Sequence, residues 1–390
     1  MEKLFLQTNN KNTNPMFDSK SITKFDFNDI LIQPSVTTDI VSRTEVVPYA
    51  DNSIYTYGKS DKGVYIGKLP LFASPMDTVI NEKNAMFFVD NKLAVCLPRG
   101  IKKYSTNFHI FASVSLDEFV NEYISKNGSV YSEFHFNEFS SVTLGHDKFY
   151  VLIDIANGHM KKMEEAIIEA KKIYGNKIFI MAGNVAHPKT YRKLSEAGAD
   201  AIRIGIGNGN GCLTTEQTGV GFPMASLIRE CYHASLMMEN PALIIADGGM
   251  KNYSDIIKAL ALGADSVMLG SILNKSLESA GPTYLFKKIK VNPQGKFAKW
   301  AFDKGFTLTK KFRGMSTKEV QKDWGADKIK TSEGVVRFRP VEYTLAQWTE
   351  NFESYLRSAM SYCNAKTLKE FREHAQINFI TDNSFKRFNK

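Results

Sequence analysis

The chain has 390 residues, 43% of them hydrophobic and 23% charged, which is ordinary for a soluble globular protein of one large domain or two smaller ones. No apolar run approaches the about 20 residues that a membrane helix needs. Residues 1–7 lead into polar, Asn-rich sequence without a signal-peptide core. We therefore expect a cytoplasmic protein without a membrane partner.

The formal net charge is +9, and the densest basic groups lie at residues 287–290 and 310–313. Because the lysines form no basic stripe with interleaved aromatic residues, we expect no nucleic-acid partner. A small substrate that carries phosphate accounts for a local basic excess equally well. The cysteines form no metal-type pairs and indicate a reducing compartment. They are Cys96, Cys212, Cys231 and Cys363.

Short apolar runs alternate with amphipathic segments over most of the chain. We expect strands at residues 69–74, 93–97, 111–116, 149–155, 178–183, 201–206, 242–248 and 266–271. Helical patterns cover residues 160–174, 188–197, 224–238, 253–262 and 345–374. Eight strands with interposed helices predict an α/β protein with a closed (β/α)8 barrel, and a doubly wound open sheet is the alternative.

Two segments depart from this alternation. Residues 119–147 are polar and aromatic without a clean period, and we expect a surface excursion there. Residues 296–345 contain few apolar repeats, which is typical of a mobile lid or a disordered segment. We expect an N-terminal extension at residues 1–23, one catalytic domain at 24–380 and a tail at 381–390.

A loop with four glycines and a cysteine follows the expected strand at residues 201–206. Its sequence is GIGNGNGCLTT at 205–215. Glycines let the backbone adopt positive φ and approach a ligand closely. A cysteine at the C-terminal edge of a barrel strand lies where such enzymes place their chemistry. The alternative is a plain Gly-rich turn with a buried thiol.

Several motifs, taken in order, resemble the IMP dehydrogenase/GMP reductase family. Besides the cysteine loop they are FDFNDIL at 25–31, SPMDTV at 74–79, MAGNV at 181–185, ADGG at 246–249, MLGS at 268–271, RGMS at 313–316 and LRSAMSYC at 356–363. The resemblance implies a (β/α)8 barrel, a purine-nucleotide substrate, a nicotinamide cofactor and a homotetramer. Residues 100–147 are too short for the pair of regulatory CBS modules that dehydrogenases commonly carry, which favours the reductase branch.

The resemblance also implies the catalytic residues. Cys212 matches the nucleophile that attacks C2 of the purine, and a loop of backbone N–H groups can stabilise its thiolate. Thr214 and Glu333 match the pair that handles the proton on the departing amine. The carbonyls of Gly207, Gly209 and Cys212 match ligands of a monovalent cation, K⁺.

Substrate and cofactor residues follow from the same resemblance. The substrate residues are Met76, Asn210, Asp247, Gly248, Gly249, Gly270, Ser271, Gly314, Met315 and Ser316. Among these, Asp247 would accept hydrogen bonds from ribose hydroxyls, and Asn210 stands where relatives commonly have a phosphate-contacting serine. The cofactor residues are Ser42, Arg43, Asp154, Ile155, Ala156, Asn157 and Lys330.

The residues that follow Gly314 bear on the reaction. Dehydrogenases of the family activate water with an Arg-Tyr pair there, whereas residues 314–336 contain no Arg and no Tyr. The segments DIANGH at 154–159 and TGVGFP at 218–223 also resemble reductases. Pro75, and Leu97 in place of a reductase lysine, point the other way. We expect an NADPH-dependent GMP reductase. An IMP dehydrogenase without CBS modules, a non-catalytic nucleotide-binding barrel and the use of NADH remain alternatives.

Overall fold

The computed structural model describes residues 23–50, 68–102, 105, 107, 109–126, 148–315, 317, 318, 320 and 334–388. It also describes the backbone of the short paired strands β2 (Gly58–Lys59) and β3 (Tyr65–Ile66). Ser316, Lys330 and Glu333 lie outside the described residues, as do the expected N-terminal extension up to residue 22 and most of 119–147.

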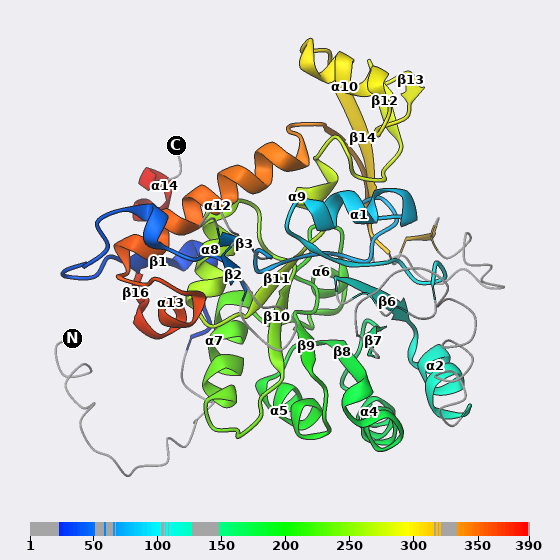
Figure 1. Cartoon of the computed structure of the whole chain (residues 1–390), viewed down its shortest axis with the longest axis vertical. Helices are drawn as coiled ribbons and strands as arrows, with labels where there is room; N and C mark the ends of the chain where they lie inside the picture. Colours follow the sequence, from blue (N-terminus) through cyan, green and yellow to red (C-terminus); the bar gives the residue numbers. More distant parts are fainter. Residues whose placement is uncertain are drawn as a thin grey trace.

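Eight parallel strands close into a barrel in the order β10-β11-β4-β5-β6-β7-β8-β9 (Figure 1). The strands are β4 (Leu71–Ala73), β5 (Ala94–Cys96), β6 (Ile110–Val114), β7 (Phe149–Asp154), β8 (Ile178–Val185), β9 (Ala201–Ile204), β10 (Leu243–Asp247) and β11 (Ser266–Leu269). Each corresponds to a predicted strand. The barrel is therefore confirmed, and the open sheet is excluded.

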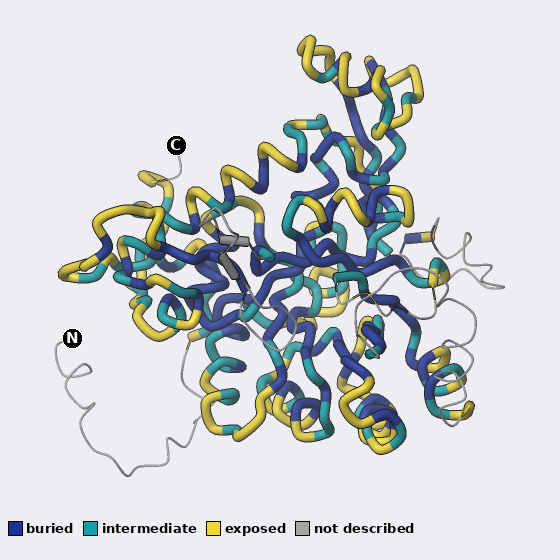
Figure 2. The backbone as a smooth tube through the Cα atoms, in the orientation of Figure 1, coloured by how far each residue is buried: buried dark blue, intermediate teal, exposed yellow. Residues whose placement is uncertain are grey.

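Alternate residues of each strand fill the barrel interior or face the surrounding helices. The interior is aromatic: the Phe111 ring makes edge contacts with Phe72, Tyr150 and Phe179 at centroid distances of 5.6–5.7 Å. The other face packs against the helices in a larger apolar cluster. Because both faces are buried, the strands appear in the sequence as apolar runs without alternation (Figure 2).

The expected helices between the later strands are present. They are α4 (Lys161–Tyr174), α5 (Pro188–Glu196), α7 (Met224–Ser235) and α8 (Tyr253–Ala261). The other elements around the barrel are α1 (Glu82–Asp90), α6 (Thr214–Thr218), α9 (Ser271–Asn274), the 3₁₀ turns η1 (Phe27–Asp29), η2 (Arg43–Glu45) and η4 (Gly175–Lys177), and the antiparallel pair β1 (Ile30–Gln33) and β16 (Gln376–Phe379). Among the helices that the structure describes, none has the length and apolar character that crossing a bilayer requires.

The start of the expected surface excursion belongs to the core. Helix α2 (Leu116–Phe119) continues into a π-helical turn, η3 (Val120–Ile124). Phe119 and Tyr123 are fully buried, and their rings stack at 5.1 Å. The expectation was therefore wrong for the first residues of this segment, because its aromatic side chains pack against the barrel instead of facing solvent.

Residues 283–313 and 336–340 contribute to a small module that projects from the barrel (Figure 1). Its antiparallel sheet has the order β13-β12-β14-β15, and α10 (Lys296–Asp303) lies beside it. The strands are β12 (Thr283–Leu285), β13 (Ile289–Val291), β14 (Leu308–Arg313) and β15 (Val336–Pro340). The expected irregularity of residues 296–345 is thus wrong over α10, β14 and β15.

Lys310 joins this module to the segment that follows α9. Its side chain is fully buried on β14, and its ammonium group donates hydrogen bonds at 2.8 Å to the carbonyls of Ser276, Leu277 and Ser279. Burial lowers the pKa of Lys310 to about 7, while the nearby Glu278 carboxylate raises it. A charged residue at this buried position interrupts the apolar alternation that identifies a strand. For this reason β14 could not be recognised from the sequence.

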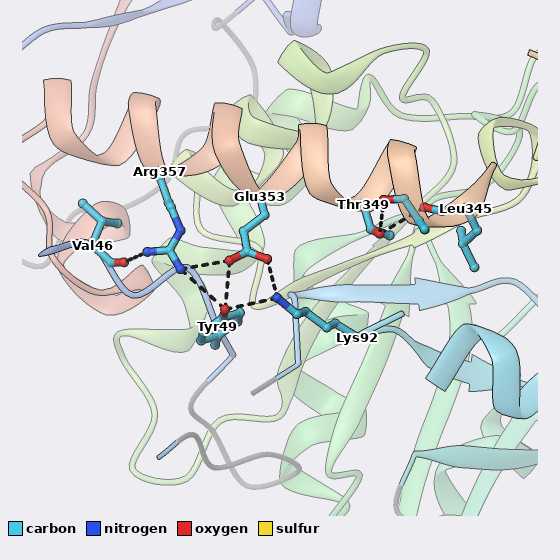
Figure 3. Close-up of polar contacts among 8 residues, drawn as sticks. Val46, Tyr49, Lys92, Leu345, Thr349, Glu353 and Arg357 are labelled. Carbon is cyan, nitrogen blue, oxygen red and sulfur yellow. Dashed lines mark hydrogen bonds and ion pairs between the residues drawn. The ribbon is translucent and has the colours of Figure 1, made fainter. Parts of the chain in front are cut away.

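The C-terminal helical stretch is two helices, α12 (Leu345–Tyr362) and α13 (Leu368–His374), followed by α14 (Asp382–Phe388). A polar network fixes α12 to the barrel (Figure 3). Glu353 accepts hydrogen bonds from Tyr49 at 2.8 Å, Lys92 at 2.6 Å and Arg357 at 2.9 Å. Burial raises the pKa of Glu353, but the hydrogen bonds from Lys92 and Arg357 lower it overall.

Candidate functional site

An open cavity of about 990 Å³ lies at the C-terminal ends of the barrel strands. The loops after β7, β8, β9, β10 and β11 line it, and residues from the end of β14 complete the wall. This is the face at which barrel enzymes carry their active sites. The volume is at the upper end of the range for small-molecule and cofactor sites.

The cavity brings together most of the predicted site residues. Those that line it are Met76, Asp154, Ile155, Ala156, Asn157, Gly207, Gly209, Asn210, Cys212, Thr214, Asp247, Gly248, Gly249, Gly270, Ser271, Gly314 and Met315. Ser42 and Arg43 do not line it: Ser42 caps η2, and Arg43 donates to Ser358 on α12 at 2.9 Å. The cofactor role expected for this pair stays a prediction.

The cysteine loop folds back tightly on itself. Gly207 has φ +79°, and a Cβ there would lie 1.7 Å from Thr215 Oγ1, so no other residue fits. The Cys212 N–H donates to the Gly209 carbonyl at 2.9 Å, and Cys212 Sγ lies 3.2 Å from Thr214 Oγ1. The loop therefore presents a half-buried thiol beside a hydroxyl on the cavity wall.

The remaining cysteines are unsuited to chemistry with a bound ligand. Cys96, Cys231 and Cys363 are buried, and burial raises the pKa of all three thiols, that of Cys363 to about 11. None of the three lines the cavity. Because the thiolate is the reactive form, Cys212 is the nucleophile candidate that a ligand can reach.

A buried arginine joins two sides of the cavity. Arg203, on β9, is 5% exposed and donates to Asp154 at 2.7 Å, Asn184 at 2.6 Å and Asp247 at 3.0 Å. Asn184 also donates to Asp247 at 2.8 Å and to the Gly205 carbonyl at 2.9 Å. Burial lowers the pKa of Arg203, but Asp247 and Asp154 raise it overall. Arg203 thus fixes both predicted carboxylates, and the sequence analysis assigned no role to it or to Asn184.

The loop after β10 presses against the cysteine loop. Gly248 and Gly249 have φ +84° and +86°, and a Cβ on Gly248 would lie 2.9 Å from the Gly209 nitrogen. Glycines at successive positions leave their backbone N–H groups uncovered by side chains, so a ligand can approach them closely. On the next loop, a Cβ on Gly270 would lie 2.6 Å from Met76 Sδ, so Met76 packs directly on that backbone.

Two histidines line the cavity beside residues 154–157. His159 Nε2 accepts a hydrogen bond from the Ala186 N–H at 3.0 Å, and its Nδ1 lies 3.0 Å from Thr190 Oγ1. Burial, and then the charge of His187, lower the pKa of His159. A neutral imidazole is therefore favoured at this end of the cavity. His159 ends the DIANGH segment, so the motif itself contained the signal.

Two neutral oxygens of the cysteine loop are candidate ligands for the expected monovalent cation. The carbonyl of Gly209 keeps a second lone pair after accepting from Cys212. Asn208 Oδ1, in the same loop, is buried and receives no hydrogen bond from any described residue. Neutral oxygens of this kind suit K⁺. No three His, Cys, Asp or Glu side chains converge on a metal position anywhere in the described part of the chain.

The chain is thus a (β/α)8 barrel of the kind found in enzymes, with a glycine-rich cysteine loop at the cavity on its C-terminal side. The family model for the IMP dehydrogenase / GMP reductase domain matches residues 142–388. The chain belongs to this family.

Individual relatives fall into two groups. GMP reductase 2 of Mus musculus is 31% identical over 93% of this chain and 97% of its own length. GMP reductase of Phytophthora infestans is 30% identical over 89% of this chain and 88% of its own. Inosine-5'-monophosphate dehydrogenase of Chlorobaculum tepidum is 34% identical over 59% of this chain. The chain spans 45% of the length of that dehydrogenase.

Proposed function

We propose that the protein is a GMP reductase that converts GMP to IMP and ammonia with NADPH. The observation that carries the proposal is the reachable Cys212 thiol, 3.2 Å from Thr214 Oγ1, in a cavity that also contains Asp247 and its two glycines. Similarity to reductases over almost their whole length supports it further, because the dehydrogenase matches cover less than half of those proteins.

The reaction follows from the chemistry of these groups. The Cys212 thiolate adds to C2 of the purine, and the 2-amino group, protonated through Thr214 and Glu333, leaves as ammonia. NADPH supplies the hydride that C2 then accepts. The C2–sulfur bond breaks, the thiolate is restored and IMP departs. Thr214 beside the sulfur supports the proton step, since such a transfer needs a donor within hydrogen-bond reach.

Binding roles follow the same plan. Asp247, held by Arg203 and Asn184, would accept hydrogen bonds from the ribose hydroxyls. The phosphate would meet backbone N–H groups of the loops after β10 and β11. These are the loops with Gly248, Gly249, Gly270 and Ser271, while Gly314 and Met315 would lie under the base and Met76 beside it. The substrate role expected for Ser316 stays a prediction, because it lies outside the described residues.

Asp154, Ile155, Ala156 and Asn157, with Lys330, Ser42 and Arg43, would hold the nicotinamide nucleotide. The cavity reaches continuously from Cys212 to Asp154, which leaves space for a second ligand beside the purine. The carbonyls of Gly207, Gly209 and Cys212 would hold K⁺ and stabilise the loop. We further propose a homotetramer, which size-exclusion chromatography with light scattering would test.

The second candidate is an IMP dehydrogenase that oxidises IMP with NAD⁺. Pro75, which lines the cavity in the SPMD motif, and the dehydrogenase matches at 33–37% identity favour it. The absence of Arg and Tyr from residues 314–336 counts against it.

Absorbance at 340 nm distinguishes these reactions. One cuvette contains GMP with NADPH or NADH, and the other IMP with NAD⁺ and potassium. Loss of signal in the first, abolished by Cys212→Ala but retained in Cys363→Ala, is the expected result. A rise in the second alone would make the protein a dehydrogenase. No change in either, with GMP bound, would leave a non-catalytic nucleotide-binding barrel and overturn the proposal.

A further inference from the structure

Two arginines of β15 converge on one side chain at the rim of the cavity. Arg337 donates to Asn210 Oδ1 at 3.2 Å, and Arg339 donates to the same oxygen at 3.0 Å. Asn210 belongs to the cysteine loop and lines the cavity, whereas β15 belongs to the projecting module. One neutral amide oxygen thus receives hydrogen bonds from two guanidinium groups.

Among the described residues, Glu342 offsets part of the positive charge of this pair, and its own ion pair is with Lys275. Neither Arg337 nor Arg339 forms an ion pair with any carboxylate of the described residues, whereas Arg313 on the adjacent strand is paired with Asp77. Burial, and then the charge of Arg337, lower the pKa of Arg339. Two like charges that share a neutral acceptor repel each other, and a bound anion would remove that penalty.

The pair is also held in place. The Arg339 guanidinium lies over the ring of Phe312 at 4.9 Å from its centroid. Phe312 is 1% exposed and forms part of the cavity wall. A guanidinium held over a buried ring loses part of its freedom, and its planar fork of N–H donors suits the oxygens of a phosphate.

The position of Asn210 shows which end of the cavity lies near the two arginines. Asn210 follows Gly209, and the Gly209 nitrogen lies 2.9 Å from the point that a Cβ on Gly248 would occupy. Asn210, which accepts from both arginines, therefore follows the residue that packs against the glycine loop after β10.

We propose that Arg337 and Arg339, together with Asn210, form an additional subsite for the phosphate oxygens of the bound purine nucleotide. This subsite rests on the proposed function, because it requires a nucleotide in the cavity. It would add charge to a phosphate site otherwise built from backbone N–H groups. The oxygens come either from the first phosphate or from a second one in a nucleoside diphosphate.

Calorimetric titration of the full chain with GMP, GDP and guanosine tests this. Arg337 is exposed, and Asn210 is the side chain with which it forms a hydrogen bond among the described residues, so Arg337→Ala removes the interaction with little effect on folding. We expect roughly a tenfold higher Kd for GMP, partial rescue in Arg337→Lys and a weaker salt dependence. Guanosine affinity should not change. Arg387→Ala, which removes an exposed arginine on α14, is the control for net charge.

The outcomes separate the proposals. If GDP binds the unaltered protein more tightly than GMP and loses more affinity in Arg337→Ala, the subsite takes a second phosphate. If GDP binds more weakly and GMP affinity falls, the subsite serves the first. Equal GMP affinities in Arg337→Ala and Arg387→Ala overturn the subsite and leave the proposed function intact. If no purine nucleotide binds the unaltered protein, both proposals fail.

Discussion

Replacement of Arg203 by methionine tests whether the buried network holds the site together. Arg203→Met keeps an unbranched chain of similar length but removes the guanidinium that binds Asp154, Asn184 and Asp247. The two carboxylates and the amide oxygen would then lose their shared donor in a site where little water replaces it. We expect both stability and substrate binding to fall.

The magnitude follows from the three contacts. Charge-assisted hydrogen bonds contribute about 1.5–3 kcal/mol each, and they are not additive within one network. Removing one partner of a buried ion pair costs about 3–5 kcal/mol, because it leaves a buried charge uncompensated. We therefore expect Arg203→Met to lower the free energy of unfolding by about 3–5 kcal/mol. Arg203→Lys keeps a positive charge without the planar fork, and it should lose less.

Guanidinium chloride unfolding followed by circular dichroism measures this loss. The matched control is Arg192→Met on α5, where the arginine forms an exposed pair with Glu196 at 2.7 Å. Such surface pairs are worth less than about 1 kcal/mol. If Arg203→Met unfolds at the same denaturant concentration as Arg192→Met, the network does not stabilise the barrel. A normal KM for GMP in Arg203→Met would refute its role in orienting Asp247.

Three further changes test other parts of the structure. Because the pKa of Lys310 in the folded protein is about 7, below its ordinary 10.5, the unfolded chain binds more protons between these values. The unfolding free energy should therefore rise by up to about 1.4 kcal/mol per pH unit from pH 7 to 10 relative to Lys310→Met, and parallel pH curves would contradict this. Glu353→Gln should lower the free energy of unfolding by about 1–3 kcal/mol at pH 7, because the pKa of Glu353 is lowered in the folded protein. The difference in thermal stability should vanish as the pH falls through that pKa. A difference that stays constant at acid pH would count against this explanation. Gly207→Ala should abolish 340 nm activity with an unchanged circular dichroism spectrum, because its Cβ would collide with Thr215; an active variant would show that the loop adapts.

The barrel could be predicted because its strands are buried on both faces. Strands β7 and β8 appear in the sequence as continuous apolar runs, and helices with clear periodicity separate the later strands. Local sequence is sufficient where burial dictates every position of a strand.

The projecting module could not be predicted in the same way. Strands β13 and β15 are largely exposed, so burial imposes little pattern on them. Strand β14 contains a buried lysine whose acceptors lie more than 30 residues away in the sequence. Only the folded chain brings these carbonyls to the ammonium group, and the strand is therefore concealed in the sequence.

The candidate site also contains some features that could be recognised from the sequence and others that could not. The glycine loops were found because close backbone contacts, as at Gly207 and Gly248, require glycine and leave a visible pattern. Arg203 was missed. A charged residue inside the apolar run of β9 is nevertheless a signal, because a buried charge needs a partner. Its partners Asp154 and Asp247 lie on other strands, so the pattern shows that a partner exists but not which one.

The Arg337–Arg339 pair depends on two long-range relations. Strand β15 pairs with β14 so that Arg337 lies opposite Phe312 and Arg339 opposite Lys310, and both arginines reach Asn210 from the same strand. Asn210 lies 127 residues before Arg337. Each strand residue is unremarkable alone, since two arginines on an exposed strand are ordinary. The pair becomes a candidate phosphate contact only because the fold brings β15 within hydrogen-bond distance of Asn210 in the cysteine loop.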